Sequence, residues 1–430
     1  MTVHPTVEEL LQRREQGHSL EAPLYTRADV FDLDMDVIFR RHWIFVGVEP
    51  DVPEPGDCMT VEVGASSVLI LRGEDMQIHA FHNVCRHRGA RLVTAEKATI
   101  GNIVCRYHGW TYGETGALLF AEHMGPEFDT SCHGLKPVHL RTLAGLIFIC
   151  LAAEAPDDFD RMAETIAPYI GPHDIANSKV AYSYDLIEEG NWKLTMENNR
   201  ECYHCAGNHP ELTIPLQAYG FGFAPDELDA FHRADAASYE GAQASASARW
   251  TEMGLPSAER EELLNATGFR AERLVLSGAG ESHTLDTRRA CGKLMADFTQ
   301  ADLGALSFWT QPNSWHHFMA DHAVTFMVMP LAPNRTLVRT KWLVHKDAAE
   351  GRDYDLENLI RVWTATNQQD ADLVALTHGG VSEPAYEPGP YSRFTEGLVE
   401  KFCQWYVARM SRHLLDAALR MPAGAPVAAE

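Results

Sequence analysis

Two short stretches, each with one cysteine and one histidine, are the first features of this chain that could do chemistry. Cys85 and His87 form a Cys-x-His pair, and Cys105 and His108 form a Cys-x-x-His pair. Two thiolates and two imidazoles can hold a zinc ion, or a [2Fe–2S] cluster in which the cysteines bind one iron and the histidines the other. Zinc-finger spacing places cysteine with cysteine and histidine with histidine, whereas each stretch here offers one of each. The pairing therefore favours a two-iron cluster gripped between two loops.

A second dense group of metal-binding side chains lies at residues 197–210, Glu-Asn-Asn-Arg-Glu-Cys-Tyr-His-Cys-Ala-Gly-Asn-His-Pro. His204 and His209 are five residues apart, which corresponds to about 140° on a regular helix. They can bind one metal ion only if the helix distorts or ends between them, and the glycine, asparagine and proline around His209 favour such an ending. Two histidines and one carboxylate on one face hold Fe(II) in non-haem oxygenases and leave positions open for O₂.

Cys202 and Cys205, in the same string, allow a different interpretation, a redox or zinc-binding Cys-x-x-Cys pair. Such a redox pair is typical of a thioredoxin-like βαβ pattern, which the surrounding sequence does not show. We therefore expect the histidines, rather than the cysteines, to carry the chemistry of this string.

The elements that must position the first group are short strands. Residues 6–50 are predicted to be helical, with a capping pattern at Thr6 and apolar residues at helical spacing from 34 to 43. From about residue 45 the pattern changes, and β-rich runs alternate with Gly, Pro and Asn turn signals, as a small all-β domain requires. The predicted strands cover residues 59–63, 67–71, 77–81, 102–105, 117–120 and 143–151.

The elements around the second group are predicted to be helices and longer antiparallel strands. The pattern becomes helical near residue 157, and a strand over 179–190 is expected to lead into a long helix that carries His204. Residues 307–345 are predicted to form antiparallel strands, with a Pro-Asn-Arg turn at 333–335. Two further helices are predicted over residues 355–377 and 393–420.

The composition is that of an ordinary globular protein and excludes several classes of function. The chain has 430 residues, 45% of them apolar, and a formal net charge of −24, which disfavours binding to nucleic acid. Its apolar runs are far shorter than the roughly 20 residues that span a bilayer, and the N-terminus lacks the pattern of a secretory signal. We therefore expect a cytoplasmic protein without a membrane segment, in which clustered Cys and His indicate metal rather than disulfides.

Both groups closely resemble the signature of the Rieske non-haem iron oxygenases, the ring-hydroxylating oxygenase α subunits. Residues 82–92, His-Asn-Val-Cys-Arg-His-Arg-Gly-Ala-Arg-Leu, and 105–112, Cys-Arg-Tyr-His-Gly-Trp-Thr-Tyr, resemble the Rieske motif. Residues 191–193, Asn-Trp-Lys, together with 197–210, resemble the mononuclear iron motif of the same family. The resemblance covers roughly residues 25–415. A separate Rieske electron-transfer protein would need only the first motif, and a two-zinc structural protein would lack the colour of the cluster.

This resemblance implies an α+β fold with two domains. An all-β Rieske [2Fe–2S] domain is expected at 43–155, and a catalytic domain with an antiparallel sheet covered by helices, a helix-grip or START-like arrangement, at 156–420. Residues 1–42 would form a helical segment that packs on the catalytic domain, and residues 421–430 would be a disordered tail.

The resemblance also implies the metal ligands. One Rieske cluster would be held by Cys85, His87, Cys105 and His108. One mononuclear Fe(II) would be held by His204, His209 and an aspartate on a later helix, for which Asp370 is expected and Asp372 is the alternative.

Glu201 occupies a position at which many family members carry an aspartate, three residues before the first iron-binding histidine. There the carboxylate links the iron site to the Rieske histidine of a neighbouring subunit. We expect Glu201 to connect His204 with His108 of the next subunit, and its spacing of three from His204 would place both on one side of a helix. Electron transfer across subunits implies a homo-oligomer, usually a trimer.

Glutamate at position 201 and the wording around it resemble the subgroup that acts on quaternary ammonium compounds, namely glycine betaine monooxygenase, stachydrine (proline betaine) demethylase and carnitine monooxygenase. The implied reaction is O₂-dependent hydroxylation of an N-methyl group of glycine betaine or stachydrine, which yields the demethylated amine and formaldehyde. The alternatives are carnitine, or an aromatic-ring or O-methyl substrate. An aromatic wall would suit such a cation, and aromatic residues that form either this wall or ordinary core are Phe308, Trp309, Trp315, Phe318 and Phe326.

Electrons must come from another protein. The chain has neither a Gly-x-Gly-x-x-Gly after a strand nor plant-type ferredoxin cysteine spacing, so it is not expected to bind NADH or flavin itself. A separate NAD(P)H-dependent reductase of the ferredoxin or flavin type is therefore implied.

Overall fold

The N-terminal helical segment begins where the sequence predicts and ends earlier. The structure, a computed structural model, describes residues 5–420, so the predicted tail lies outside the described residues. Thr6 caps the first helix, because its hydroxyl accepts a hydrogen bond from the backbone N–H of Glu9 while the Glu9 carboxylate accepts one from the backbone N–H of Thr6. The helices of this segment are α1 (Val7–Arg13), α2 (Ala22–Thr26) and α3 (Ala28–Asp34), followed by a π-helical turn (Met35–Phe39).

The prediction of helix up to residue 50 is wrong at its end, since Ile44–Val48 form strand β1. All five residues of β1 are buried, so the segment lacks the polar face that an amphipathic helix would show.

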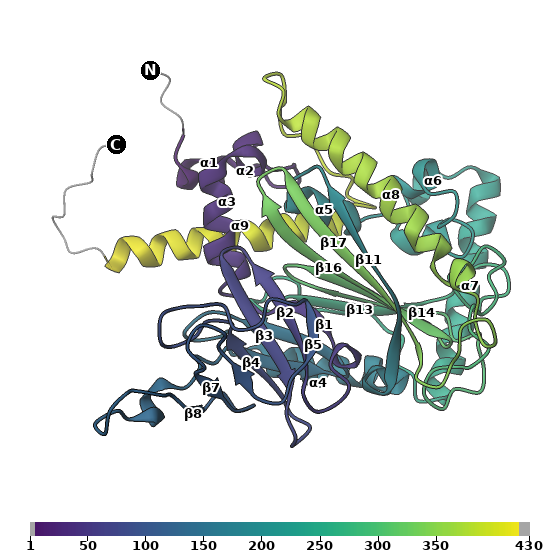
Figure 1. Ribbon diagram of the computed structural model, residues 1–430. Coiled ribbons are helices and arrows are strands. Elements are labelled where there is room, and N and C mark those ends of the chain that lie inside the picture. Colours follow the sequence, from purple (N-terminus) through teal and green to yellow (C-terminus); the bar gives the residue numbers. More distant parts are fainter. Residues whose placement is uncertain (1–4, 421–430) are drawn as a thin grey trace.

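The first β-rich region contains three small antiparallel sheets (Figure 1). One has the strand order β4-β3-β2-β5, one the order β6-β7-β8, and one the order β1-β10-β9. Their bounds are β2 (Asp57–Val63), β3 (Ser66–Arg72), β4 (Ile78–His82), β5 (Lys97–Thr99), β6 (Ile103–Val104), β7 (Thr111–Tyr112), β8 (Leu118–Phe120), β9 (His139–Leu143) and β10 (Leu146–Cys150). The all-β character of this region is confirmed.

Strand β10 lies within the strand predicted over residues 143–151, which begins too early, because Ala144 and Gly145 form a tight turn that joins β10 to β9. Gly145 has a φ of +92°, and a Cβ on it would lie 2.6 Å from the backbone nitrogen of Ala176. This turn therefore needs a glycine, and the Gly in the run was the signal for a break.

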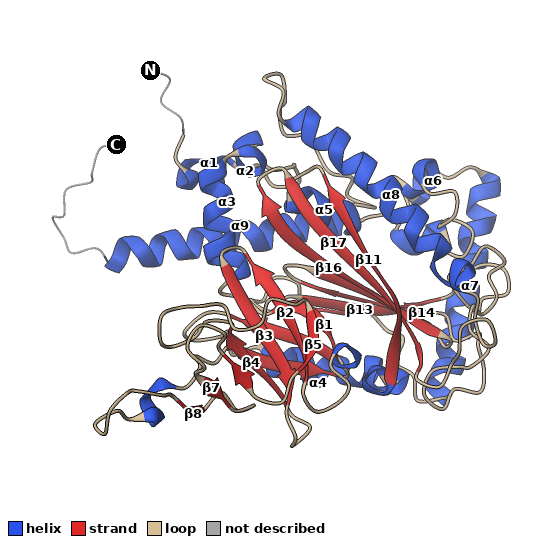
Figure 2. Ribbon diagram, in the orientation of Figure 1, coloured by secondary structure: helices blue, strands red, loops and turns tan. Residues whose placement is uncertain are grey.

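The second region is built on one seven-stranded antiparallel sheet with helices on it (Figure 2). Its strand order is β11-β17-β16-β15-β14-β13-β12. The strands are β11 (Ser178–Glu188), β12 (Arg260–Glu261), β13 (Phe269–Leu274), β14 (Ala305–Thr310), β15 (Ser314–Phe318), β16 (His322–Ala332) and β17 (Arg335–His345). The predicted turn joins β16 and β17, and the α+β fold with a helix-covered antiparallel sheet is confirmed.

The remaining helices are α4 (Phe159–Ile170), α5 (Trp192–Asn199), α6 (Cys205–Asn208), α7 (Ala230–Glu252), α8 (Leu356–Val381) and α9 (Gly397–Arg420). In Figure 1, α8 runs along the face of the sheet formed by β11, β17 and β16. Helix α7 was not predicted, because it is rich in Ala and Ser and buries only Ala236, Tyr239 and Trp250. Among the described residues, no helix is long and apolar enough to cross a membrane.

Candidate metal centres and active site

The two cysteine–histidine stretches fold into two matching turns. The backbone N–H of Cys85 donates to the carbonyl oxygen of Ala90, and that of Cys105 donates to Trp110, both at 2.8 Å. Gly89 and Gly109 donate back to the carbonyls of the two cysteines at 3.1 and 3.0 Å. Both glycines have positive φ, +74° and +71°, and a Cβ on either would meet no atom within 4 Å. The positive φ favours glycine at both positions, and the space beside each of these glycines is open.

The donor atoms of these turns are arranged for a cluster with one buried and one exposed side. The cysteines are buried, whereas His87 and His108 are exposed with ring centroids 4.6 Å apart. The Tyr112 hydroxyl lies 3.2 Å from the sulfur of Cys85 and accepts a hydrogen bond from a backbone N–H, and burial raises the pKa of this tyrosine. Two thiolates inside and two imidazoles outside fit the ligand set of a Rieske cluster, whose potential such hydroxyl contacts tune.

Helix α5, which leads to the second group, is fixed at its start by a buried ion pair. Asn191 caps the helix, because its side-chain oxygen accepts a hydrogen bond from the backbone N–H of Lys193. The ammonium of Lys193 pairs with Asp34 from α3, and the same carboxylate accepts the indole N–H of Trp192 at 3.0 Å. These contacts of Trp192 and Lys193 join the N-terminal helices to the helix that leads into the site.

The prediction of a long helix that carries His204 is wrong. Helix α5 ends at Asn199, and Arg200 is fully buried where its guanidinium donates to the carbonyl of Thr310 at 3.2 Å and lies over the Trp309 ring. His204 sits in the turn that follows, just before the four-residue helix α6. Glu201 and His204 therefore meet across a turn and not along a helix.

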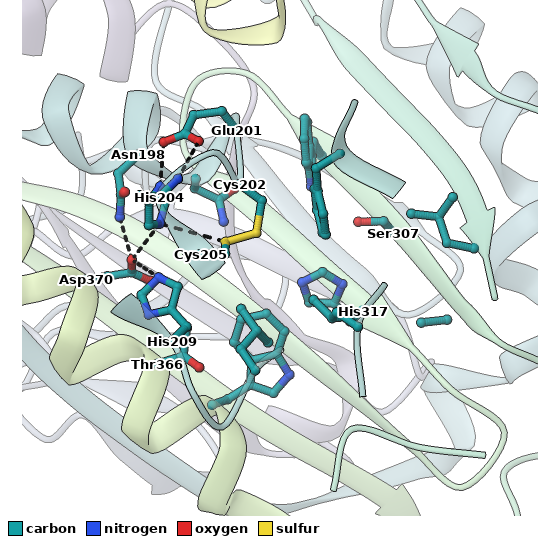
Figure 3. Close-up of a pocket in the computed structure, with 18 of the residues that line it drawn as sticks. Asn198, Glu201, Cys202, His204, Cys205, His209, Ser307, His317, Thr366 and Asp370 are labelled. Carbon is teal, nitrogen blue, oxygen red and sulfur yellow. Dashed lines mark hydrogen bonds and ion pairs between the residues drawn. A yellow bond between two sulfur atoms is a disulfide. The ribbon is translucent and has the colours of Figure 1, made fainter. Parts of the chain in front are cut away.

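His204, His209 and Asp370 converge on one point (Figure 3). The Nε2 atom of His209 lies 3.0 Å from Asp370 Oδ1, and that of His204 lies 3.4 Å from the same oxygen. Donor atoms bound to one metal ion at about 2.1 Å are about 3.0 to 3.4 Å apart. The His209 Nε2 atom is buried and has no hydrogen bond, since its contact with Asp370 has the distance but not the direction of one. Its lone pair is thus free to bind a metal.

The other ring nitrogen of each histidine is held by an acceptor. His204 Nδ1 lies 2.5 Å from Glu201 Oε1, and His209 Nδ1 lies 2.9 Å from Gln369 Oε1. An Nδ1–H that donates to such a group leaves Nε2 as the metal-binding atom and fixes the ring. Asn198 donates to Asp370 Oδ1 at 2.7 Å and orients the carboxylate in the same way.

The electrostatics of the site favour a bound cation. Burial disfavours the imidazolium of His204, but hydrogen bonds and charge interactions with Asp370 and Glu201 outweigh it and raise its pKa to about 9. Burial raises the pKa of Asp370, but the two histidines and Asn198 outweigh this effect and lower it. A site that holds positive charge between two carboxylates, with three convergent donors on one side, fits Fe(II).

Asp372, the alternative third ligand, points away from this site. It is exposed and accepts a hydrogen bond from Gln368. The geometry therefore singles out Asp370.

An apolar pocket lies beside the three donors, between α8 and the sheet (Figure 3). Residues 305, 307 and 309 of β14 face it, because alternate residues of a strand share a face. Residues 363, 366 and 370 of α8 face it from the opposite side at helical spacing. The pocket is completed by leucines 212, 216, 274 and 276, by Phe221 and His317, and by the turn that carries His204.

Of the five aromatic residues considered from the sequence, Trp309 lines the pocket. The other four are buried and do not line it. Phe308 lies on the opposite face of β14, and Phe326 supports the pocket residue Trp363 at a centroid distance of 5.0 Å. Burial and the neighbouring histidines keep the pKa of His317 well below its ordinary value, so this part of the wall is uncharged.

Several residues of the site were not singled out from the sequence. Asn198 stands inside the motif and Gln369 is adjacent to Asp370, so their positions were the only available signal. Phe221 and Trp363 carried no signal, because their contribution depends on how distant segments pack.

The two candidate metal centres lie far apart in one chain. In Figure 1 the strands β7 and β8 next to the cysteine–histidine turns and the helix α6 next to His204 lie at opposite sides of the molecule. The histidines of the first centre point outward, and an electron leaving them has no short path to the iron site of the same chain.

Comparisons with known proteins agree with both centres. Residues 42–138 match the model of the Rieske [2Fe-2S] domain, and residues 175–412 match that of the ring hydroxylating alpha subunit (catalytic domain). The chain is 44% identical, over 94% of its length and 89% of the relative's, to the glycine betaine monooxygenase oxygenase subunit of Chromohalobacter salexigens. It is 41% identical, over 94% of its length and 92% of the relative's, to the subunit of that name from Pseudomonas aeruginosa.

A crystal structure of the quaternary ammonium Rieske monooxygenase CntA with a bound inhibitor has a similar fold. The TM-score is 0.70 at 20% sequence identity, over 95% of this chain and all of the other. With a Rieske [2Fe–2S] domain and a catalytic domain of the type that binds mononuclear iron, this chain belongs to the ring-hydroxylating oxygenase α subunits, the family of Rieske non-haem iron oxygenases.

Proposed function

We propose that this chain is the oxygenase component of a Rieske monooxygenase that hydroxylates an N-methyl group of a betaine, glycine betaine or stachydrine. The carbinolamine so formed collapses to formaldehyde and the demethylated amine. The observation that carries the proposal is 41–44% identity over 94% of the chain to glycine betaine monooxygenase oxygenase subunits.

The pocket supports a small quaternary ammonium substrate. Phe221 and Trp363 offer aromatic surface, and such surface attracts a permanent cation, whereas the Trp309 ring already lies beside the guanidinium groups of Arg200 and Arg270. Among the described residues that line this pocket there is no Lys or Arg, while Glu201 and Asp370 are acidic. A quaternary ammonium group with one methyl group directed at the metal ligands fits this pocket.

The roles of the site residues follow from their contacts. Bound iron supplies the activation of O₂. His204, His209 and Asp370 would hold that iron on one side and leave the pocket side open. Glu201 and Gln369 would keep the two imidazoles in the orientation that binds it, and Asn198 would do the same for the carboxylate of Asp370.

Electrons would enter through Cys85, His87, Cys105 and His108 from a separate NAD(P)H-dependent reductase, as in the multicomponent systems to which relatives of this chain belong. We also propose a homo-oligomer, a trimer in the simplest case, in which His108 of one subunit approaches Glu201 of the next. Each centre has an exposed tyrosine beside it, Tyr107 at 56% and Tyr203 at 70% exposure, and a subunit interface would cover such surface.

The test is single turnover of the iron-loaded protein whose cluster has been chemically reduced. Glycine betaine, stachydrine, carnitine and naphthalene are compared at equal concentration, and formaldehyde and the amine product are measured. We expect one of the two betaines to yield formaldehyde and demethylated amine in equal amounts, with the smallest yield from naphthalene. A hydroxylated aromatic product without formaldehyde from any betaine would disprove the proposal.

A further inference from the structure

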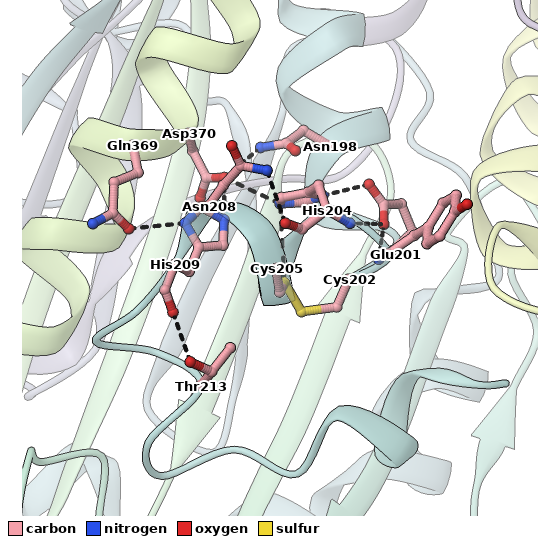
Figure 4. Close-up of a disulfide and its surroundings, with 11 residues drawn as sticks. Asn198, Glu201, Cys202, His204, Cys205, Asn208, His209, Thr213, Gln369 and Asp370 are labelled. Atoms are coloured by element: carbon pink, nitrogen blue, oxygen red, sulfur yellow. Dashed lines mark hydrogen bonds and ion pairs between the residues drawn. A yellow bond between two sulfur atoms is a disulfide. The ribbon is translucent and has the colours of Figure 1, made fainter. Parts of the chain in front are cut away.

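Cys202 and Cys205 lie directly against the metal-binding atoms. The two cysteines form a disulfide that spans Tyr203 and His204 (Figure 4), and both side chains line the active-site pocket (Figure 3). The Cys205 sulfur lies 4.0 Å from His204 Nε2. The ligand atoms of His204, Cys205 and His209 all lie within 4.8 Å of one another. The position of Cys205 is therefore that of a potential metal ligand.

We propose that the redox state of Cys202 and Cys205 sets the number of protein ligands at this centre. As a disulfide, Cys205 has no thiolate to offer, and the site keeps the three donors His204, His209 and Asp370. As a dithiol, Cys205 becomes a fourth donor, which converts the site into a four-ligand N₂OS set of the kind that zinc prefers. The inference rests on the proposed metal-ligand role of His204, His209 and Asp370, and not on the identity of the substrate.

The Cys205 sulfur would have to move only a short distance to bind a metal ion together with His204. A sulfur and a nitrogen bound to one tetrahedral zinc ion are about 3.5 Å apart, given bond lengths of about 2.3 and 2.0 Å. The sulfur of Cys205 is thus about 0.5 Å too far from His204 Nε2 in the disulfide form, and a rotation of the freed side chain closes that gap.

The backbone of the turn does not depend on the disulfide. The N–H of Cys205 donates to the carbonyl of Cys202 at 3.2 Å, and the carbonyl of Cys205 accepts the N–H of His209 at 2.9 Å. On the other side, the Glu201 carboxylate accepts the backbone N–H of Tyr203. Reduction therefore frees the two sulfurs and leaves Cys205 next to the histidines.

The chemistry is ordinary thiol–disulfide exchange. A small disulfide such as oxidised glutathione accepts two electrons and two protons from the pair, which forms the Cys202–Cys205 bond and releases two glutathione thiols. A dithiol reagent reverses the exchange. The Cα atoms of the two cysteines are 4.9 Å apart, within the range that a disulfide spans.

The test uses full-length protein with its Rieske cluster retained and its mononuclear iron removed by a chelator. The protein is treated with oxidised glutathione or with a dithiol, loaded with one equivalent of Zn²⁺, and measured by X-ray absorption at the zinc edge, to which the cluster irons do not contribute. Zinc affinity is measured in parallel by chelator competition. Trypsin cleavage after Arg200 and Arg233 yields a peptide that holds both cysteines and no other, and its mass reports the disulfide.

We expect a zinc–sulfur shell at about 2.3 Å in the reduced protein and none in the oxidised protein. Zinc affinity should rise on the order of 10–100-fold on reduction, while Fe(II) affinity changes less. Cys202→Ser cannot form the internal disulfide and should show the sulfur shell after dithiol treatment, whereas oxidised glutathione should cap its free Cys205 as a mixed disulfide and remove the shell. Cys205→Ser should show it under neither condition, and Cys132→Ser, which removes an exposed thiol elsewhere, should behave like the parent.

Absence of the sulfur shell from both the reduced parent and Cys202→Ser would overturn the proposal. A tryptic peptide that carries two glutathiones in place of an internal disulfide would overturn it as well. His209→Ala should weaken zinc binding in both redox states, and unchanged binding there would instead disprove the ligand assignment. A failure of betaine oxidation alters none of these measurements, so the two proposals are separable.

Discussion

Glu201 Oε1 and His204 Nδ1 are 2.5 Å apart, on the side of the imidazole ring opposite to Asp370. The same carboxylate accepts the backbone N–H of Tyr203, so its position is fixed by the turn. Only 12% of the Glu201 side chain is exposed, yet it borders open space next to the pocket. Glu201 therefore contacts the iron ligand from behind and can be reached from outside the chain.

This position leads to the first prediction. Glu201→Gln should retain iron and cluster but slow the oxidation of the prereduced cluster by substrate and O₂ by at least about 100-fold, because the link that we propose between His204 and His108 of the neighbouring subunit would lose its charge. Glu201→Asp should recover part of the rate. The measurement is a stopped-flow single turnover together with iron analysis. A near-normal rate in Glu201→Gln would show that the link is unused, and loss of iron would show that Glu201 supports metal binding instead.

A second prediction concerns the independence of the two centres. Cys85→Ser should abolish the visible spectrum of the cluster while leaving mononuclear iron bound, because the two centres use separate segments of the chain. Cys132→Ser, in the same domain and exposed, is the matched control and should keep the spectrum. The measurements are visible absorption and iron content. Loss of both metals from Cys85→Ser would indicate a folding defect and would contradict the predicted independence.

How far the sequence determines this site is clear from α5 and the turn after it. The string around His204 is dense enough in ligand types to predict a metal site, and the resemblance to a family adds Asp370 from more than a hundred residues away. The end of α5 could not be predicted, because it depends on Arg200 reaching the carbonyl of Thr310, a contact between distant segments. The Glu201–His204 contact was predicted from helical spacing, but in the structure the two residues meet across a turn.

The pocket wall shows the same limit. Trp309 and Phe308 are neighbours of similar type, and only the register of β14 against β13 and β15 decides which of them faces the cavity. Trp363 faces the cavity because the side of α8 that carries Asp370 packs on the sheet. Strand and helix positions were therefore predictable from local pattern, whereas the identity of the pocket residues required the packed structure.

A third prediction concerns Gln369, whose amide oxygen lies 2.9 Å from His209 Nδ1 and whose nitrogen donates to Glu211 at 2.8 Å. Gln369→Leu removes the acceptor that fixes this ring, and iron affinity should fall about 10–100-fold. Gln369→Glu restores an acceptor and should bind iron more tightly than Gln369→Leu. Gln368→Leu, at the exposed neighbouring position, is the matched control. Equal iron affinity in Gln369→Leu and the control, measured by chelator competition, would contradict the role.

A fourth prediction concerns Trp363, which is 5% exposed, lines the pocket and donates its indole N–H to His283 at 3.0 Å. Trp363→Leu should raise the KM for the betaine about 5–30-fold, the loss of one desolvated cation–π contact. Trp363→Phe keeps an aromatic face without the indole N–H and should lose less. Steady-state kinetics with the reductase measure both. Equal KM values in the two variants would show that shape, and not aromatic character, sets binding.

The last prediction concerns Glu188, a buried carboxyl near the iron site that accepts the hydroxyl of Thr195. Burial raises its pKa to about 8, with the charge of Asp370 adding to the effect and the Thr195 hydrogen bond opposing it. Below a pH of about 4.5 the carboxyl is neutral in both folded and unfolded chains. As the pH rises from there to about 8 only the unfolded chain releases the proton, so stability falls with rising pH and levels off above that value.

Glu188→Gln mimics the neutral carboxyl and removes this dependence. The Tm of Glu188→Gln relative to the parent should therefore increase between pH 6 and pH 8.5, by an amount equivalent to at most about 3 kcal/mol. Glu189→Gln is the matched control, since Glu189 is the adjacent residue and its side chain is 64% exposed, and its Tm difference should stay constant. Thermal melts of all three proteins in the same buffers measure this. A difference that stays constant between pH 6 and pH 8.5 would mean that Glu188 is already ionised in the folded protein at neutral pH.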